Sequence, residues 1–569
     1  MNQTRTFLIF ALLAVAYMLF MAWEKDYAPQ PSAAVASSSS AATPAIADSS
    51  VPGASASVSP TTAVAVPGSV NEASAQLISV TNDVLRLTID TRGGSVVRSE
   101  LLTFAVEPRT RRNPDPAPVR LLDDEREHFF VSQNGLVSNQ GDAPDHRAVF
   151  QAAQTSYALT QGQDELKVDL TWQDAAGLKV TKTFTLKRGS YVVGVDQKIE
   201  NGGSTAWQGN AYQQLQRVAP AQERTWWQNF SDPSSHSFFG AAWFSPENKF
   251  ESLAFADFQK KPLNRAITGG WAAMLQHYFF VAWIPQAQDP NTFSTSVINP
   301  DTAQPIYLIR TVGPSLNVAP GQSLTTASRM YIGPKLQGTL DQVAPGLDLT
   351  TNYGWLTVVA QPLHWLLSKL HGLTGNWGVA IILLVLGLKA ALWKLTAAQF
   401  RSGAKMRKLQ PRVNALKERY GDDKMKMQQA MMELYKKEKV NPMSGCLPIL
   451  ITMPVFFGLY RVLMESVELR HAPFFGWIHD LSAPDPFFVL PVLYVLVMLA
   501  TQFLSPPAAG MDPAQQKMMK VMPVVFGFMF LFFPAGLVLY WVVNGLTSLT
   551  QQWLITRSVD RAEEKAKAA

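Results

Sequence analysis

The chain has 569 residues, 47% of them hydrophobic, a net charge of +6 and near-neutral mean hydropathy, so we expect a soluble part beside a membrane part. Its one cysteine, Cys446, excludes an intrachain disulfide and any multi-cysteine zinc or iron–sulfur site. The sequence motifs of nucleotide hydrolases, zinc proteases and elbow-type hydrolases are absent, so we expect no enzyme, no catalytic residues, no metal and no cofactor.

The amino-terminal 27 residues contain the apolar run Phe7 to Trp23, followed by Glu24-Lys25-Asp26. This run is longer than a usual signal-peptide core, and the nearest small-x-small site, Ala34-Val35-Ala36, is distant. We therefore expect an uncleaved transmembrane anchor with a cytoplasmic amino terminus. Residues 28–72 are rich in Ala, Ser and Pro and are expected to form a flexible tether.

Residues 73–340 show the period of two that is typical of strands. Apolar and polar residues alternate from Leu166 to Trp172 and, after a turn at Ala175-Ala176-Gly177, again from Leu178 to Leu186. Similar runs predict further strands at Val84 to Ile89, Tyr191 to Ile199 and Ser323 to Ile332. This pattern predicts a large antiparallel β-sandwich outside the membrane.

The helical pattern returns beyond residue 352. Residues 352–374 are apolar but broken by polar positions, which favours an amphipathic helix at the membrane interface, with its two histidines interfacial and not metal ligands. Five spans are expected after it, at Trp377 to Thr396, Cys446 to Leu463, Phe487 to Leu504, Met518 to Phe533 and Leu537 to Ile555. With the anchor, they predict a bundle of six transmembrane helices with both termini inside.

Lys389 interrupts the first of these five spans. A cation near a bilayer centre costs about 2.5 to 3.5 kcal/mol on insertion scales, so it should face a partner, water or the nearer interface. Its ammonium either snorkels toward the side of Lys394 or lines a wet cavity. In the last span, a polar stripe repeats every three or four residues at Tyr540, Asn544, Thr547 or Ser548, and Gln551. Hydrogen bonds between helices would also explain the stripe, but Lys389 favours a shared wet groove.

Residues 398–441 form a basic loop, with twelve Lys or Arg against five acidic residues between Arg401 and Val440. The positive-inside rule makes this loop cytoplasmic. Apolar spacings of three and four predict a helical hairpin with a Met-rich seam, interrupted at Gly421-Asp422-Asp423. Its basic exterior is either a solvated face or a dock for lipid headgroups, ribosomal RNA or an acidic nascent chain. The candidate recruitment residues are Arg407, Lys408, Arg412, Lys417 and Arg419.

Four motifs from Trp355 to about Arg557 resemble the YidC membrane protein insertase family. They are Gly375-Asn376-Trp377-Gly378, Asn441-Pro442-Met443-Ser444-Gly445-Cys446-Leu447-Pro448, Trp477-Ile478-His479-Asp480-Leu481-Ser482 and Phe533-Pro534-Ala535-Gly536-Leu537-Val538-Leu539-Tyr540-Trp541. The anchor, tether and sandwich resemble the long Gram-negative form, whose periplasmic domain is a β-supersandwich akin to sugar-mutarotase folds.

This resemblance implies a multi-pass inner-membrane insertase and chaperone with a five-helix core at residues 375–557 and a charged cytoplasmic tail at residues 558–569. It implies a hydrophilic groove, open to cytoplasm and lipid, whose charge is Lys389, where the family usually has arginine. Lysine keeps the charge but loses the bidentate fork. Substrate contacts carry over to Met453, Phe456 and Tyr540, and the polar stripe adds Asn544 and Gln551 to the candidate groove.

The partners implied by the resemblance are nascent membrane proteins, the Sec translocon, the ribosome, signal recognition particle components and anionic lipids, with no role for DNA. A secondary transporter would also place polar residues in the membrane, but the sequence shows no inverted repeat. The sandwich alone would suit a membrane-tethered carbohydrate-binding protein. We interpret its aromatic pairs, Trp226-Trp227 and Phe238-Phe239, as core and not as sugar platforms.

Overall fold

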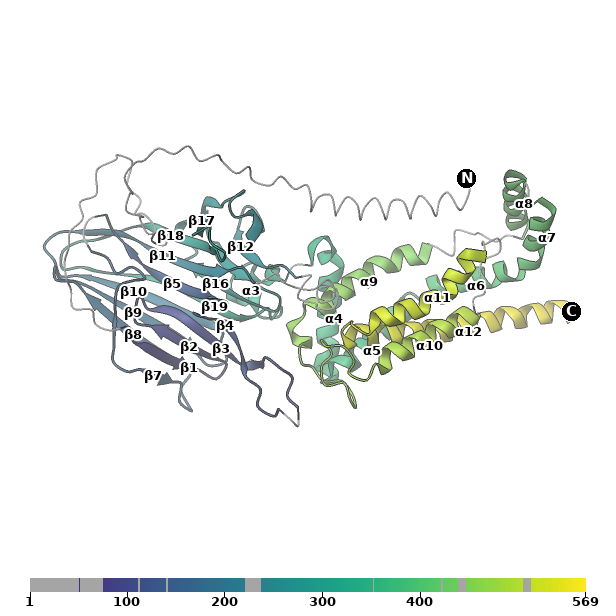
Figure 1. The fold of residues 1–569 in the computed structure, drawn as a ribbon, viewed down its shortest axis with the longest axis horizontal. Coiled ribbons are helices and arrows are strands. Elements are labelled where there is room, and N and C mark those ends of the chain that lie inside the picture. Colours follow the sequence, from purple (N-terminus) through teal and green to yellow (C-terminus); the bar gives the residue numbers. More distant parts are fainter. Residues whose placement is uncertain are drawn as a thin grey trace.

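A computed structural model describes residues 51, 75–110, 113–139, 142–220, 237–351, 353–420, 423–438, 447–504 and 513–568. The predicted anchor, the pair Trp226-Trp227 and, apart from residue 51, the predicted tether lie outside these residues. The described chain has a β-sandwich at one end of its long axis and a helical region at the other (Figure 1).

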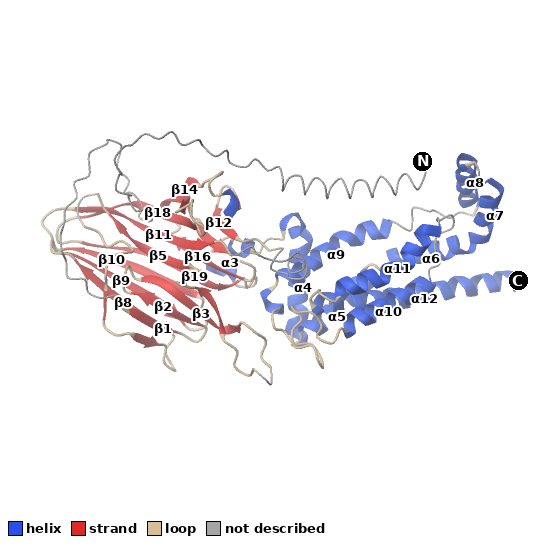
Figure 2. Ribbon diagram, viewed as in Figure 1, coloured by secondary structure: helices blue, strands red, loops and turns tan. Residues whose placement is uncertain are grey.

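Two large, mainly antiparallel sheets form the sandwich (Figure 2). The first sheet has the order β14 (Asn264–Thr268), β17 (Pro290–Ile298), β18 (Ile306–Val318), β11 (Trp207–Val218), β5 (Phe130–Val137), β3 (Ser95–Ala105), β2 (Leu85–Asp90), β1 (Leu77–Thr81) and β7 (Ser156–Ala158), with β4 (Pro118–Leu122) beside β3. The second has the order β13 (Lys249–Ala254), β12 (Gly240–Ser245), β15 (Trp271–Leu275), β16 (Phe279–Pro285), β19 (Ser323–Pro334), β10 (Val192–Asn201), β9 (Leu178–Lys187), β8 (Glu165–Gln173) and β6 (Gln151–Ala152).

The predicted hairpin is present as the antiparallel pair β8 and β9, with Val168 opposite Phe184. Alternate residues of both strands are buried in the core between the sheets, as a half-buried strand requires. The same alternation also turns Lys182 inward, where it is fully buried. Of the aromatic pair Phe238-Phe239, Phe238 packs against a core cluster and Phe239 lies at a cavity described below.

The helical region begins after the sandwich and carries the short helix α3 (Leu340–Val343) before its long helices. The long helices are α4 (Thr357–Thr374), α5 (Trp377–Ala391), α6 (Trp393–Lys408), α7 (Gln410–Tyr420), α8 (Lys424–Lys437), α9 (Leu447–Glu465), α10 (Val489–Leu504), α11 (Pro513–Phe530) and α12 (Ala535–Ala568). Helices α7 and α8 lie at the end of the molecule away from the sandwich (Figure 1).

Helices occupy all five ranges predicted as spans after residue 375, but the first is divided. Helix α5 ends at Ala391 and α6 begins at Trp393, and the pair is bent by 69°. The predicted continuous helix from Trp377 to Thr396 is therefore wrong. Within the described residues, this bent pair meets a length and hydropathy criterion for crossing a membrane, whereas no single helix does. The six-span count therefore remains a prediction.

The sandwich is joined to the helical region at the end of α9. Val467 belongs to the core cluster of the sandwich, and the Nε2 atom of His277 lies 2.9 Å from the carbonyl oxygen of Met464. The guanidinium of Arg470 donates a hydrogen bond of 3.2 Å to the carbonyl of Val106. Apolar burial and hydrogen bonds thus hold the two regions together.

Candidate functional site

A cavity of about 460 Å³ lies between α5, α6, α9 and α12. Its lining is Val385, Leu388, Lys389, Leu392, Thr396, Gln399, Phe400, Met453, Val455, Phe456, Phe457, Tyr540, Trp541, Asn544 and Ser548. We call it the Lys389 cavity. It combines an extensive apolar surface with a few polar groups, which is the usual composition of a binding site.

The start of α5 fixes one side of this cavity. Asn376 is the N-cap of α5, because its side chain accepts a hydrogen bond of 3.1 Å from the backbone N–H of Val379. Its amide also donates to the carbonyl of Phe474 at 3.1 Å. A Cβ atom on Gly378 would lie 2.0 Å from the Phe474 ring, so glycine permits this close contact. These residues belong to the Gly375-Asn376-Trp377-Gly378 motif and position the helix that carries Lys389.

The bend at Leu392 places residues from both α5 and α6 on the cavity. Helix α5 ends at Ala391, and Thr396 in the first turn of α6 accepts a hydrogen bond of 2.7 Å from the Gln551 amide of α12. This contact joins α6 to α12 just beyond the bend. Lys389 and Thr396 consequently line the same cavity.

The ammonium of Lys389 faces α12 across the cavity. Its Nζ donates a hydrogen bond of 2.6 Å to Oγ of Ser548, which itself donates to the carbonyl of Asn544 at 2.7 Å. Lys389 is half-buried, and among the described residues that line the cavity it is the only Lys, Arg, His, Asp or Glu. The cavity is therefore positively charged, and Ser548 rather than Thr547 supplies its hydroxyl from the polar stripe.

Aromatic rings join α9 to α12 along one wall. The Phe456 ring is stacked 6.2 Å from that of Tyr540 and lies 4.7 Å from that of Trp541, measured between centroids. Met453, one helical turn before Phe456 on α9, also lines the cavity and is exposed. Such contacts favour a fixed spacing between the two helices.

The structure brings together five of the six groove residues expected from the sequence: Lys389, Met453, Phe456, Tyr540 and Asn544. Gln551 does not line this cavity. Its side chain is buried, and its amide donates to Oγ1 of Thr396 and lies 3.4 Å from the carbonyl of Trp393. Hydrogen bonding between helices, the alternative explanation of the stripe, accounts for this position.

The basic loop folds into helices α6, α7 and α8, with Asp423 as the N-cap of α8. Two of the candidate recruitment residues are in ion pairs: Lys408 with Asp560 at 2.8 Å and Arg412 with Glu438 at 2.6 Å. The guanidinium of Arg419 lies 5.6 Å from the ring centre of Tyr420. The other two, Arg407 and Lys417, lie on α6 and α7.

Several lining residues were not among the expected groove residues. Trp541 belongs to a quoted motif and is adjacent to Tyr540, so its position was accessible to the sequence. Thr396, Gln399 and Phe400 follow the bend, and only a folded structure shows that they turn toward α12. In the described part of the chain, no group of three or more His, Cys, Asp and Glu side chains is arranged to hold a metal ion.

Two family models match the chain. The model described as the YidC periplasmic domain matches residues 77–366, and the model described as the 60Kd inner membrane protein matches residues 369–563. Their boundary falls within α4, at the start of the helical region.

Curated relatives named membrane protein insertase YidC match almost the whole chain. The protein of Thioalkalivibrio sulfidiphilus is 43% identical, covering 99% of this chain and 100% of the relative. That of Aeromonas hydrophila is 45% identical, covering 99% of each chain. That of Stenotrophomonas maltophilia is 46% identical, covering 98% of this chain and 97% of the relative.

Two solved structures also resemble this chain. A crystal structure of an active YidC insertase with its first transmembrane domain resolved has 19% identity and a TM-score of 0.36, and covers 84% of this chain and 94% of that one. A galactose mutarotase related enzyme from Lactobacillus acidophilus has 10% identity and a TM-score of 0.29, and covers 45% of this chain and 97% of that one.

Proposed function

Because the chain belongs to the YidC family of membrane protein insertases, we propose that it inserts newly made membrane proteins through the Lys389 cavity. The observation that carries this proposal is the meeting of Lys389, Met453, Phe456, Tyr540 and Asn544 around one cavity. In a site of reduced dielectric, the unneutralised ammonium attracts an acidic residue of the substrate's outer segment.

The energy for insertion comes from the substrate and the membrane. An apolar helix of about twenty residues gains free energy when it leaves water for lipid. The membrane potential adds about 2.3 kcal/mol per 100 mV for each acidic charge moved outward. The cavity lowers the barrier by keeping the hydrophilic segment solvated over part of the path. This scheme needs no nucleotide and no covalent step.

The proposed topology has six spans in the inner membrane. These are the anchor, α9, α10, α11, α12 and the bent pair of α5 and α6, with both termini cytoplasmic and the sandwich periplasmic. The excess of basic residues between Arg401 and Val440 supports this orientation. Helix α4 exposes Val358, Trp365 and Leu373, which suits a helix lying at the lipid interface.

The basic hairpin is the proposed contact for cytoplasmic partners, namely the ribosome, signal recognition particle components and anionic lipids. The ion pairs of Lys408 and Arg412 give these two side chains a structural role as well. Cooperation with the Sec translocon belongs to the same proposal. Reversing the charge of Arg419 and its exposed neighbours should reduce recruitment before insertion, which ribosome co-sedimentation measures.

Site-specific photo-crosslinking tests the path through the cavity. A photoreactive amino acid at Met453, Phe456 or Tyr540 should capture a nascent membrane protein during insertion. Phe503 on α10 is the matched control, because it is 87% exposed and is not part of the cavity lining. Capture from Phe503 as efficient as that from the cavity positions would contradict the proposed path.

A further inference from the structure

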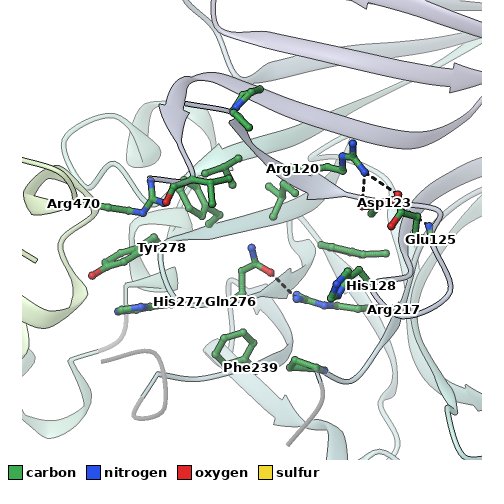
Figure 3. Close-up of a pocket in the computed structure, with 18 of the residues that line it drawn as sticks. Arg120, Asp123, Glu125, His128, Arg217, Phe239, Gln276, His277, Tyr278 and Arg470 are labelled. Atoms are coloured by element: carbon green, nitrogen blue, oxygen red, sulfur yellow. Dashed lines mark hydrogen bonds and ion pairs between the residues drawn. The ribbon is translucent and has the colours of Figure 1, made fainter. Parts of the chain in front are cut away.

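A second cavity, of about 800 Å³, lies where the sandwich meets the segment between α9 and α10 (Figure 3). The sandwich contributes β4, the end of β11 and the turn before β16, and the other side is formed by Arg470, His471 and Ser482. We call it the junction pocket. Its size is in the range of small-molecule sites.

Arg217 contributes a buried positive charge to this pocket. The residue is 9% exposed, its guanidinium lies 4.6 Å from the ring centre of Phe130, and Nη2 donates to Oε1 of Gln276 at 2.6 Å. Its Nη1 is buried and has no hydrogen-bond partner among the residues that the structure describes. Burial lowers the pKa of Arg217 to about 10, which leaves it charged at neutral pH. Among the described residues no carboxylate pairs with this guanidinium, and an uncompensated buried charge is costly.

The neighbouring Arg120 differs in this respect. Arg120 lies 3.1 Å from Asp123 and 3.1 Å from Glu125, so its charge is neutralised within the wall of the pocket. Figure 3 shows Arg217 and Gln276 pointing toward one another, with Arg470 on the opposite side of the pocket. Arg217 and Arg470 are therefore the two arginines of this pocket without an ion pair among the described residues, and Arg217 is the one with a buried Nη1 that lacks a hydrogen-bond partner there.

The loop beside the pocket has the character of a membrane interface. Within the segment that carries Arg470 and Ser482, Phe475 is 76% exposed and Phe487 is 69% exposed. Trp477 of the same segment is 37% exposed, and tryptophan is enriched at the level of lipid headgroups. At the rim, Val106 is 55% exposed and offers apolar contact to the first carbons of a lipid. An arginine fork matches the oxygen atoms of a phosphate group.

We propose that the junction pocket binds the phosphate group of a phospholipid headgroup, with Arg217 as its counter-ion. Such binding would fix the sandwich to the outer surface of the membrane beside the segment that links α9 to α10. This role is separate from substrate insertion, and it concerns a different leaflet from the basic hairpin.

Native mass spectrometry of the full-length protein in maltoside detergent tests the proposal. The protein is titrated with dihexanoyl phosphatidylglycerol below its micelle concentration. Arg217→Met keeps the side-chain bulk and removes the charge, and it should weaken the site about 10- to 100-fold, the range for a charge-assisted hydrogen bond. Arg265→Gln is the control, because Arg265 is paired with Glu251 and lies outside the pocket; it should leave binding unchanged. Equal affinity in wild type and Arg217→Met would overturn the proposal.

Changes at the exposed rim test the same site if Arg217→Met fails to fold. Val106→Glu should weaken phosphatidylglycerol binding and Val106→Lys should strengthen it, because only the charge beside the phosphate changes. Identical affinities in the two variants would contradict an anion in this pocket. Two competitors distinguish the source of the anion: displacement of the lipid by equimolar inorganic phosphate, or by an acidic peptide at lower concentration, would overturn the assignment to a lipid headgroup.

Discussion

The two regions of the molecule each enclose a lysine, but the surroundings of the two ammonium groups differ. In the sandwich, Lys182 is fully buried, and its Nζ donates to the carbonyls of Gly93 at 2.5 Å and Asn134 at 3.2 Å. The same ammonium lies 4.7 Å from the ring centre of Phe150. In the helical region, Lys389 is half-buried on an open cavity and bonds to one serine hydroxyl.

The difference lies in what remains free around each ammonium. Backbone carbonyls and an aromatic face surround Lys182, so the lysine joins elements of the core and has no room for a ligand. Within the described part of the chain Lys389 has one hydrogen-bond partner and a cavity beside it, so its remaining N–H groups can meet water or a substrate. A buried lysine alone therefore does not mark a functional site; the space next to it does.

Charge reversal should give the largest difference in stability between variants of the two lysines. Lys182→Glu would place a carboxylate against two carbonyl oxygens and should destabilise the sandwich by more than about 4 kcal/mol. Lys389→Glu should leave the fold intact, because its side chain reaches the cavity. Limited proteolysis of both purified variants measures this contrast. Equal protease resistance of the two would show that the two sites do not differ as described.

The pH dependence of stability sharpens the same contrast. Burial lowers the folded-state pKa of Lys182 to about 7, from an ordinary value of 10.5. Between these values the unfolded state binds more protons, so stability should rise with pH across this window by up to about 1.4 kcal/mol per pH unit.

Thermal melting of wild type and Lys182→Met from pH 6.5 to 9 measures this contribution. Other titrating groups cancel in the difference between the two proteins. The melting temperature of the wild type should rise relative to that of Lys182→Met as the pH rises. A difference that is constant with pH would mean that Lys182 does not change its charge in this window.

The third prediction concerns the function of Lys389. Lys389→Ala should reduce insertion of a substrate with an acidic outer segment about tenfold, the effect of roughly 1.4 kcal/mol, whereas Lys389→Arg should preserve it. Reconstituted proteoliposomes with two substrates that differ by one acidic residue give the measurement. Equal yields of both substrates in wild type and Lys389→Ala would exclude an electrostatic role and favour snorkelling.

The smallest expected effect belongs to Ser548. Ser548→Ala removes the hydroxyl that accepts from Lys389 but keeps the charge in the cavity. Insertion of the acidic substrate should fall about two- to threefold, since a single hydrogen bond contributes about 0.5 to 1.5 kcal/mol. Thr547→Ala is the control, because the Thr547 hydroxyl donates to carbonyls of its own helix. A larger loss in Thr547→Ala would contradict a positioning role for Ser548.

Local patterns in the sequence were sufficient for much of the fold. The alternation from Leu166 to Leu186 predicted the hairpin of β8 and β9, because strand period depends on neighbouring residues alone. The buried Lys182 falls in the same period but was not singled out from the sequence, and only the fold shows which carbonyls accept from that lysine. The pattern of three and four likewise predicted the paired helices of the basic loop.

Contacts between distant residues explain what the sequence did not predict. No proline or glycine lies at Leu392 to mark the bend, and the hydrogen bond between Thr396 and Gln551 just beyond it joins residues far apart in the sequence. The stripe on α12 showed which face is polar but not where the cavity ends, so Gln551 was grouped with Asn544 although it lies in the contact with α6. Arg217 carried no sequence signal, since its missing counter-charge is visible only after folding.

On the proposed path through the Lys389 cavity, two positions on α12 set a minimum reach for a substrate. This helix has 34 residues, and Asp560, which pairs with Lys408, follows Ser548 by 560 − 548 = 12 residues. At 1.5 Å per residue the two positions are about 18 Å apart along the helix. An extended chain covers this distance with about five residues. Consider a hydrophilic tail that starts at the level of the Lys408–Asp560 pair. If it has fewer than about five residues before its first acidic group, that acidic charge would not reach Lys389.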